Sequence, residues 1–141
     1  MAQSLQYCTF YLEKLLFGIE LRGVQEVIQY VEMTPVPLAP EAVSGLINLR
    51  GQIVTAIDLR RRLELGLRPD GSLPANVVAR SEDGSVSLLV DEIGDVVEVN
   101  DETFEPPPET LHGTIREVLM GVHKLEGRLL HVLDADKVAM I

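Results

Sequence analysis

The sequence predicts an all-β fold with a few short helices, arranged as two small five-stranded β-barrels on one chain. Three observations support this. Hydrophobic residues make up 46% of the 141 residues but aromatic residues only 4%, so Val, Leu and Ile must build most of the core, a composition that favours strands. Short segments of alternating apolar residues are separated by glycine turns and proline-rich pieces. One strand–turn–strand–helix unit also occurs twice.

The repeat is visible when GLINLRGQIVTAIDL, beginning at Gly45, is set over GVHKLEGRLLHVLDA, beginning at Gly121. At this offset of 76 residues the turn glycines coincide, and so does the aspartate after each second strand. Self-similarity at a fixed offset indicates a duplicated unit, and small β units commonly close as barrels, which hides their strand edges. We therefore expect approximate halves of 1–70 and 71–141. The sequence leaves open whether they exchange terminal strands.

Local patterns predict the elements of the first half. Gln6–Leu12 and Leu15–Leu21 alternate as a hairpin around a polar turn. Val24–Ile28 carries apolar residues at helical spacing, so we expect one or two helical turns there, leading into a strand. The three prolines in 35–40 keep that piece extended and outside a sheet interior. A hairpin turning at Gly51 follows.

A short helix is expected after this hairpin, with Asp58 as its N-cap and with Leu59 and Leu63 on one face. The second half predicts the same kinds of element in a similar order. They are a hairpin of 76–79 and 86–90 around 82–84, a helical turn leading into a strand over 93–99, an extended proline-rich piece at 105–109, and strands 119–123 and 128–133 turning at 126–127.

Charge and composition exclude several classes of partner. A net charge of −10 argues against nucleic acid, which attracts a basic footprint, and against an anionic membrane surface. The N-terminus lacks a signal-peptide pattern, and no apolar run reaches the roughly 20 residues of a membrane span. The single cysteine, Cys8, lies in the first strand pattern and is expected to be a small buried hydrophobe. We expect a cytoplasmic protein without direct membrane contact.

No residue pattern calls for an active site, so we expect no enzyme activity, cofactor or metal. Asp58 and Asp134 are explained as helix caps at equivalent positions. The three histidines lack metal-site spacing, although His123 and His131 could face each other across the last hairpin as an unliganded surface pair. Residues 60–62, three consecutive arginines, are interpreted as the solvated face of a helix near its negative C-terminal end.

The remaining candidates are surface residues. Arg50 precedes a turn glycine, so its side chain should project from the hairpin end, either pairing with a nearby acid or serving as a docking anchor. Val24 is expected mainly in the core, with Glu26 directed differently. Both segments lie at barrel ends, so we predict that Glu26 and Arg50 form an ion pair beside Val24.

The order FGIELRGVQEVIQ, MTPVPLAPEAVSGLINLRGQIVTAIDLR, SLLVDEIGDVVEV, PPPE and MGVHKLEGRLLHVLD resembles the CheW family of chemotaxis coupling proteins, over about Gln6 to Val138. GLINLRG followed by VxxIDLR is the most specific combination. The resemblance implies a single CheW-like domain over 1–141, made of two SH3-like five-stranded barrels without catalysis. No kinase, receiver or phosphotransfer segment accompanies it, so it resembles the standalone adaptor.

The resemblance also implies partners and site residues. Family members bridge the cytoplasmic tip of chemoreceptors to the regulatory domain of the histidine kinase CheA, as monomers that assemble into extended arrays. Matched to the family motifs, receptor contact falls on Val24, Glu26 and Arg50. The proline usual after the second strand's valine is Thr55 here, which is expected to alter strand-edge packing. A CheW-like adaptor of another chemosensory pathway, such as type IV pilus motility, is the alternative, and an enzyme or metal-binding protein ranks last.

Overall fold

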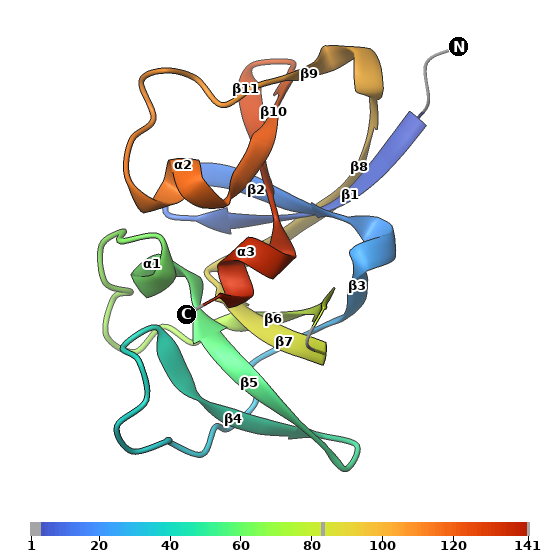
Figure 1. The fold of residues 1–141 in the computed structure, drawn as a ribbon. Helices are drawn as coiled ribbons and strands as arrows, with labels where there is room; N and C mark the ends of the chain where they lie inside the picture. Colours follow the sequence, from blue (N-terminus) through green and yellow to red (C-terminus); the bar gives the residue numbers. More distant parts are fainter. Residues whose placement is uncertain (1–3, 83, 141) are drawn as a thin grey trace.

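The computed structural model describes residues 4–82 and 84–140, and its strands form two units stacked end to end (Figure 1). In chain order the elements are β1 (Ser4–Leu12), β2 (Leu15–Glu20), the 3₁₀ helix η1 (Leu21–Gly23), β3 (Val24–Ile28), β4 (Val43–Leu49), β5 (Gln52–Asp58), α1 (Leu59–Arg62), β6 (Ala75–Ser81), β7 (Gly84–Val90), β8 (Glu92–Asn100), the 3₁₀ helix η2 (Asp101–Thr103), β9 (Phe104–Glu105), α2 (Thr114–Val118), β10 (Leu119–Leu125), β11 (Arg128–Leu133) and α3 (Ala135–Ala139). The all-β expectation with short helices is confirmed.

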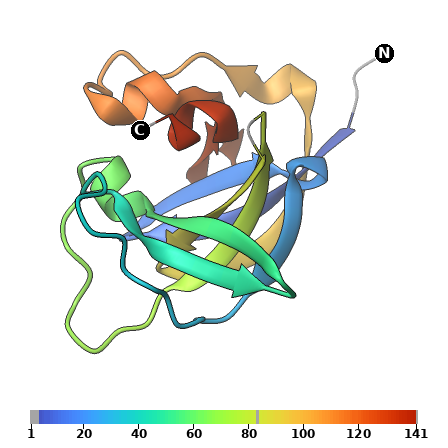
Figure 2. The same cartoon turned by 60° about the horizontal axis from the view of Figure 1, so that its bottom comes forward.

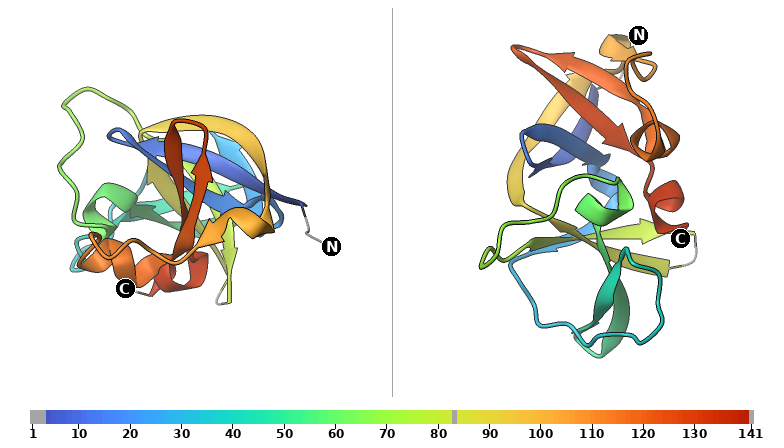
Figure 3. Two further views of the ribbon diagram at one scale, coloured as in Figure 1. Left: turned by 90° about the horizontal axis from the view of Figure 1, so that it is seen from above. Right: turned by 90° about the vertical axis from the view of Figure 1, so that its left-hand side faces the viewer.

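The two sheets do not follow the approximate halves 1–70 and 71–141. One sheet has the order β8-β1-β2-β11-β10-β9 and the other β3-β6-β7-β5-β4. The N-terminal hairpin therefore belongs with the C-terminal strands, because β2 pairs in parallel with β11 and β1 pairs antiparallel with β8. We call the first sheet with α2 and α3 the terminal unit, and the second with α1 the central unit. Their separation is clearest in the right-hand view of Figure 3.

The repeated sequence folds twice into the same motif. The β4–β5 hairpin pairs Val43 with Ile57, and the β10–β11 hairpin pairs Leu119 with Leu133. Each hairpin has a register shift two residues into its first strand and continues into a short helix. The aspartate side chain caps both helices: Asp58 accepts from the Arg60 amide, and its counterpart accepts from the amides of residues 136 and 137. The duplicated unit and both caps are confirmed.

The helical turns expected at Val24–Ile28 and within 93–99 are wrong. Both segments are strands, β3 and β8. The helical turn of the first half lies directly before β3, in η1. A register shift between Val24 and Glu26 adds a residue to β3 and breaks the strict alternation that marks a strand. The apolar residues thus acquire a helix-like spacing, although β-branched residues favour the strand. The turn between β6 and β7 includes Asp83, which lies outside the described residues.

Thr55, the departure from the family pattern, does not lie at a sheet edge. It pairs with Leu46 of β4 on one side and with Val86 of β7 on the other, in the interior of the central sheet. Proline has no N–H and is disfavoured in such a position. Threonine therefore supplies a backbone donor to an interior strand, rather than changing the packing of an edge as expected.

The largest hydrophobic cluster lies between the two sheets and joins them. It combines Phe10 and Phe17 of the terminal unit with Val77 and Leu88 of the central unit, all fully buried. Smaller clusters fill the interior of each unit. Cys8 is buried as expected, and burial raises the pKa of its thiol. The two units therefore share one core and are not independent domains.

The helices add a polar connection between the units. Viewed from the lower end, α1 of the central unit lies close to α2 and α3 of the terminal unit (Figure 2). The Arg62 guanidinium donates to the carbonyl oxygens of Lys137, Val138 and Met140, at 2.8–3.1 Å. These acceptors lie at the C-terminal end of α3, where the last carbonyls lack full helical pairing, although the Lys137 carbonyl also accepts from the Met140 amide at 3.2 Å. One arginine thus caps a helix of the other unit.

Replacing this cap gives a measurable prediction. Arg62→Ala is expected to lower the free energy of unfolding by about 1–2 kcal/mol, since it removes three charge-assisted hydrogen bonds at a partly exposed site. Arg62→Lys keeps the charge without the fork and should recover only part of the loss. Urea unfolding at neutral pH measures both. Equal stability of the alanine variant and the wild type would contradict the capping role.

Candidate partner-binding site

Arg50 is presented by a tight turn at the end of the β4–β5 hairpin. Leu49 and Gln52 are the last paired residues, so Arg50 and Gly51 form a two-residue loop. Both have positive φ, 50° and 87°, as a type I′ hairpin turn requires. The Asn48 side chain accepts a hydrogen bond from the Gly51 amide at 2.8 Å. The sequence Asn-Leu-Arg-Gly therefore fixes the turn and leaves the Arg50 side chain 78% exposed.

Glu26 reaches the same turn from β3. Its two carboxylate oxygens accept from the Arg50 guanidinium at 2.6 and 3.3 Å, a bidentate contact. The Glu26 side chain is only 17% exposed, so the carboxylate is held firmly while the arginine faces solvent. The predicted ion pair is confirmed. A register shift in β3 separates Val24 from Glu26. Val24 is partly buried and packs against the main core, as expected.

The ion pair fixes the orientation of its two side chains more than it stabilises the fold. An exposed salt bridge contributes about 0–1 kcal/mol, because water and salt screen it. A bidentate contact nevertheless restricts both side chains to one geometry, which lowers the entropy lost when a partner binds. The site is thus a preformed, polar anchor on a rigid hairpin end, next to a partly buried valine. That Val24, Glu26 and Arg50 bind a receptor stays a prediction.

The histidines do not form a surface pair. His123 and His131 are both buried, and they occupy adjacent rungs of the β10–β11 hairpin, opposite Leu130 and Val122 respectively. Successive rungs point to opposite faces of a sheet, so the two rings diverge. His131 donates from Nδ1 to the Leu16 carbonyl at 2.8 Å. Among the described residues no group of three His, Cys, Asp or Glu side chains is placed to hold a metal ion.

His123 is a neutral, enclosed ring. Its Nδ1 lies 2.8 Å from the Thr103 hydroxyl, which itself donates to the Asn100 carbonyl, so Nδ1–H is the donor. The ring lies between Tyr7 and Phe104, with centroids 5.4 and 5.1 Å away. Burial lowers the pKa of the imidazole, and the Asp101 charge opposes this only in part.

An NMR titration of the folded protein should therefore give His123 a pKa below the ordinary value of 6.5. A lowered histidine pKa means that the unfolded chain gains its proton first. The stability linked to this ring is thus present above 6.5 and is lost as the pH falls from 6.5 through the folded-state pKa. A His123 midpoint at or above 6.5 would contradict the assignment.

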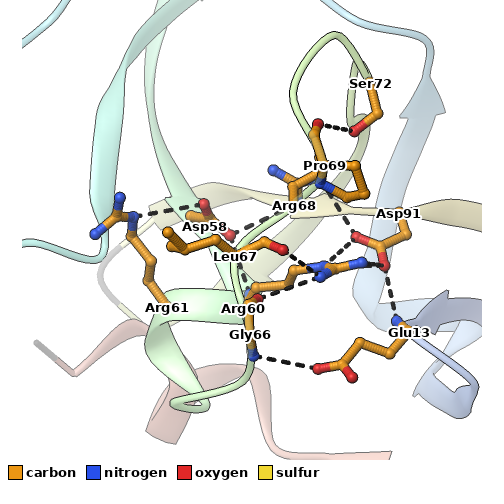
Figure 4. A network of polar contacts seen from close by, with 10 residues as sticks. All are labelled: Glu13, Asp58, Arg60, Arg61, Gly66, Leu67, Arg68, Pro69, Ser72 and Asp91. Carbon is orange, nitrogen blue, oxygen red and sulfur yellow. Dashed lines mark hydrogen bonds and ion pairs between the residues drawn. The ribbon is translucent and has the colours of Figure 1, made fainter.

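The arginines after Asp58 are only in part the solvated helix face that was expected, because Arg61 is exposed but Arg60 is not. Arg60 is buried, with 11% of its side chain exposed, and makes a multidentate contact with Asp91 at 2.5–3.0 Å (Figure 4). It also donates to the Gly66 and Leu67 carbonyls at 3.2 and 2.9 Å. Arg62 caps α3, and Arg61 pairs with Glu41. The charges are used for internal contacts.

Asp91 stands where the chain passes from β7 to β8, between the two units. It accepts from the Glu13 amide in the β1–β2 turn at 2.7 Å as well as from Arg60, while Arg68 approaches to 3.4 Å. Burial alone raises the pKa of the Asp91 carboxyl, but these hydrogen bonds and arginine charges outweigh it, so the pKa lies below its ordinary range. The hydrogen bond to Asp91 in turn raises the pKa of Arg60.

Known proteins resemble this chain along nearly its whole length. A model of the CheW-like domain family matches residues 6–140. The chain belongs to this family. A protein of Treponema pallidum named chemotaxis protein CheW is 32% identical over 139 residues, covering 96% of this chain and 82% of the relative. Proteins of the same name from Rhizobium meliloti and Bacillus subtilis are 31% and 30% identical, each covering 86% of this chain and 79% and 78% of the relative.

A solved structure agrees with the fold. The scaffolding protein TtCheW from Thermoanaerobacter tengcongensis superimposes with a TM-score of 0.89 at 25% identity, over 99% of this chain and 94% of that one. The resemblance inferred from the motifs is therefore confirmed, as is the architecture of two SH3-like β units. Within the described part of the chain, no helix is both long and apolar enough to cross a membrane.

Proposed function

We propose that the protein is a non-catalytic adaptor of bacterial chemotaxis, which couples the cytoplasmic tip of chemoreceptors to the regulatory domain of the histidine kinase CheA. The observation that carries the proposal is the family match along nearly the whole chain, residues 6–140, with relatives named chemotaxis protein CheW. The protein acts in the cytoplasm as a monomer that joins receptor and kinase into extended arrays, and its function needs contacts rather than turnover.

The receptor side of the proposal rests on Val24, Glu26 and Arg50. The guanidinium is exposed and held by a carboxylate, so it offers directed donors to polar groups of an incoming helix. The neighbouring valine supplies apolar contact at its exposed edge. A preordered arginine beside an apolar residue has the composition typical of an interface anchor.

The kinase side rests on exposed apolar residues of the central unit. Leu38 is fully exposed and Ile53 is 61% exposed, although both are large hydrophobic side chains. We expect kinase binding to depend on such residues, so that Ile53→Ser weakens it by about tenfold while a rise in salt changes it little. Titrations of the kinase regulatory domain at low and high salt measure both effects. Binding that falls steeply with salt but tolerates the serine would contradict an apolar contact.

Reconstitution tests the adaptor function directly. Receptor-containing membranes and CheA are combined with and without the protein, and kinase autophosphorylation from ATP is followed. We expect kinase activity to respond to the receptor only when the protein is present. Equal receptor control in its absence would overturn the proposal. The protein incubated alone with ATP is the control for turnover of its own.

A further inference from the structure

The register shift in β3 decides which way Glu26 faces. Residues opposite each other in an antiparallel pair lie on the same face of the sheet, and successive rungs alternate between the two faces. Val24 lies opposite Ala79, and Glu26 lies opposite Val78, which is the next rung. The valine and the glutamate therefore face opposite ways, although residues two positions apart share a face in a regular strand.

A regular strand would place the Glu26 carboxylate in the core. If β3 continued without the shift, Glu26 would lie opposite Val77 instead of Val78. Val77 belongs to the large cluster between the two sheets and is fully buried. A carboxylate on that face would be buried without a partner, which is costly. The extra residue, Gln25, lets the valine before it pack against the core while the glutamate after it turns to the other face.

One rung of the β6–β7 hairpin holds the bulge in place. Arg80 and Ser85 are paired across these two strands. The Ser85 hydroxyl donates to Oε1 of Gln25 at 2.7 Å. Nη1 of Arg80 donates to the backbone carbonyls of Arg22 and Val24, at 3.0 and 3.3 Å. A bulge interrupts the regular ladder of hydrogen bonds, so side chains that bind beside it help to fix its position.

The bulge brings the apolar and the charged parts of the proposed receptor site together. The valine needs the core-facing side of β3. The Glu26 carboxylate needs the opposite side, where it accepts from the Arg50 guanidinium at 2.6 and 3.3 Å. Bulges commonly redirect a side chain next to a functional site. The groups that hold this bulge therefore act on the orientation of the ion pair without being part of it.

We propose that Arg80 and Ser85 are positioning residues, which hold the bulge at Gln25 and so keep Glu26 directed at Arg50. Removing both is expected to loosen the bulge, so that the carboxylate meets the guanidinium for a smaller fraction of the time. The part of this inference that concerns binding rests on the proposed receptor site. The part that concerns the ion pair itself does not.

The variant Arg80→Met with Ser85→Ala tests the proposal first in the free protein. The nitrogen NMR signals of the Arg50 guanidinium report its contact with Glu26, and Glu26→Ala gives their position when that contact is absent. We expect the double variant to move the Arg50 signals toward the position that they have in Glu26→Ala. Ser85→Thr, which keeps the hydroxyl donor, should leave them close to wild type.

Arg116→Met is the matched control for loss of an arginine that binds the backbone. Nη1 of Arg116 also donates to backbone carbonyls, those of Pro107 and Pro108 at 3.4 and 2.6 Å, but on the terminal unit. This variant should leave the Arg50 signals and receptor binding unchanged. An equal effect of both arginine substitutions would mean that any such loss disturbs the ion pair, and it would overturn the proposal.

Receptor-tip titrations measure the consequence for binding. Arg80→Met with Ser85→Ala should weaken binding by about tenfold when Arg50 is present. The same two substitutions should change binding by no more than about twofold when Arg50→Ala is already present, because a positioning residue acts only through the group that it positions. A direct receptor contact by Arg80 or Ser85 would weaken binding equally in both backgrounds, which would contradict the positioning role.

The two measurements separate failure of this inference from failure of the proposed function. Unchanged Arg50 signals in the double variant would overturn the positioning role, whatever the receptor does. If the wild-type protein does not bind the receptor tip, the proposed function fails, and the NMR comparison still decides the positioning role. Thermal melts check that each variant is folded. Ser85→Ala alone is compared in the same way if the double variant is not.

Discussion

Reversing the charge of Arg50 is expected to weaken receptor binding strongly while leaving the fold intact. Arg50→Glu removes the exposed guanidinium and places a second carboxylate beside Glu26, so the anchor loses its donors and its orientation. Loss of an interface hot spot of this kind weakens binding by about thirtyfold or more. Stability should change by only about 1 kcal/mol, because the substituted Arg50 side chain is 78% exposed, although its partner Glu26 is 17% exposed. Titration of a receptor-tip fragment and thermal melts measure the two effects.

The exchange of both charges separates a true pair from two independent residues. Glu26→Arg alone should also weaken receptor binding, and the double exchange should recover part of the loss if the two side chains act as partners. Arg61→Glu is the matched control, because that arginine also forms an ion pair with an exposed glutamate on the central unit. The pair has no functional role if the double exchange binds no better than the worse single variant, or if the control is equally impaired.

Features encoded by neighbouring residues could be predicted from the sequence. The hairpin turn at Gly51, the aspartate caps and the repeat each depend on a few consecutive residues, and the structure has all three. The Glu26–Arg50 pair was also predicted, although the segment that carries Glu26 is the strand β3 and not the expected helical turn. For the turn, the caps and the repeat, the local pattern and the tertiary structure agree.

Features that depend on distant contacts could not be predicted. Nothing near Arg60 in the sequence indicates that it is buried, because its partner Asp91 lies 31 residues away and belongs to the connection between units. The division of strands between the two sheets likewise depends on β2 meeting β11, which no local pattern specifies. In β3, the register shift between Val24 and Glu26 hid a strand behind a helix-like spacing. The sequence did contain two distant signals for Arg60. Asp91 lies at the junction of two strands, and the chain has few arginines and lysines that could pair with it.

Removing Asp91 is expected to cause the largest loss of stability. Asp91→Ala leaves Arg60 buried without its partner, and breaking a buried pair from one side lowers the free energy of unfolding by about 3–5 kcal/mol. The loss should be larger than for Glu41→Ala, which removes one partner of an exposed pair and changes stability by at most about 1 kcal/mol. Urea unfolding at neutral pH compares the two. Replacing both partners with apolar residues, Arg60→Met with Asp91→Leu, should recover part of the loss, because the Arg60 charge is then no longer buried without its partner.

The pH dependence of unfolding identifies the charge of Asp91 as the cause. The pKa of its carboxyl is lowered in the folded state, so its contribution to stability is fully present above the ordinary value of 3.8. That contribution is lost as the pH falls below 3.8 through the lowered folded-state pKa. The stability difference between wild type and Asp91→Ala should therefore be constant from neutral pH down to about pH 5 and narrow in stronger acid. A difference that stays constant into strong acid would mean that Asp91 acts through packing alone. In that case, the connection between the two units would not depend on the ionised carboxylate.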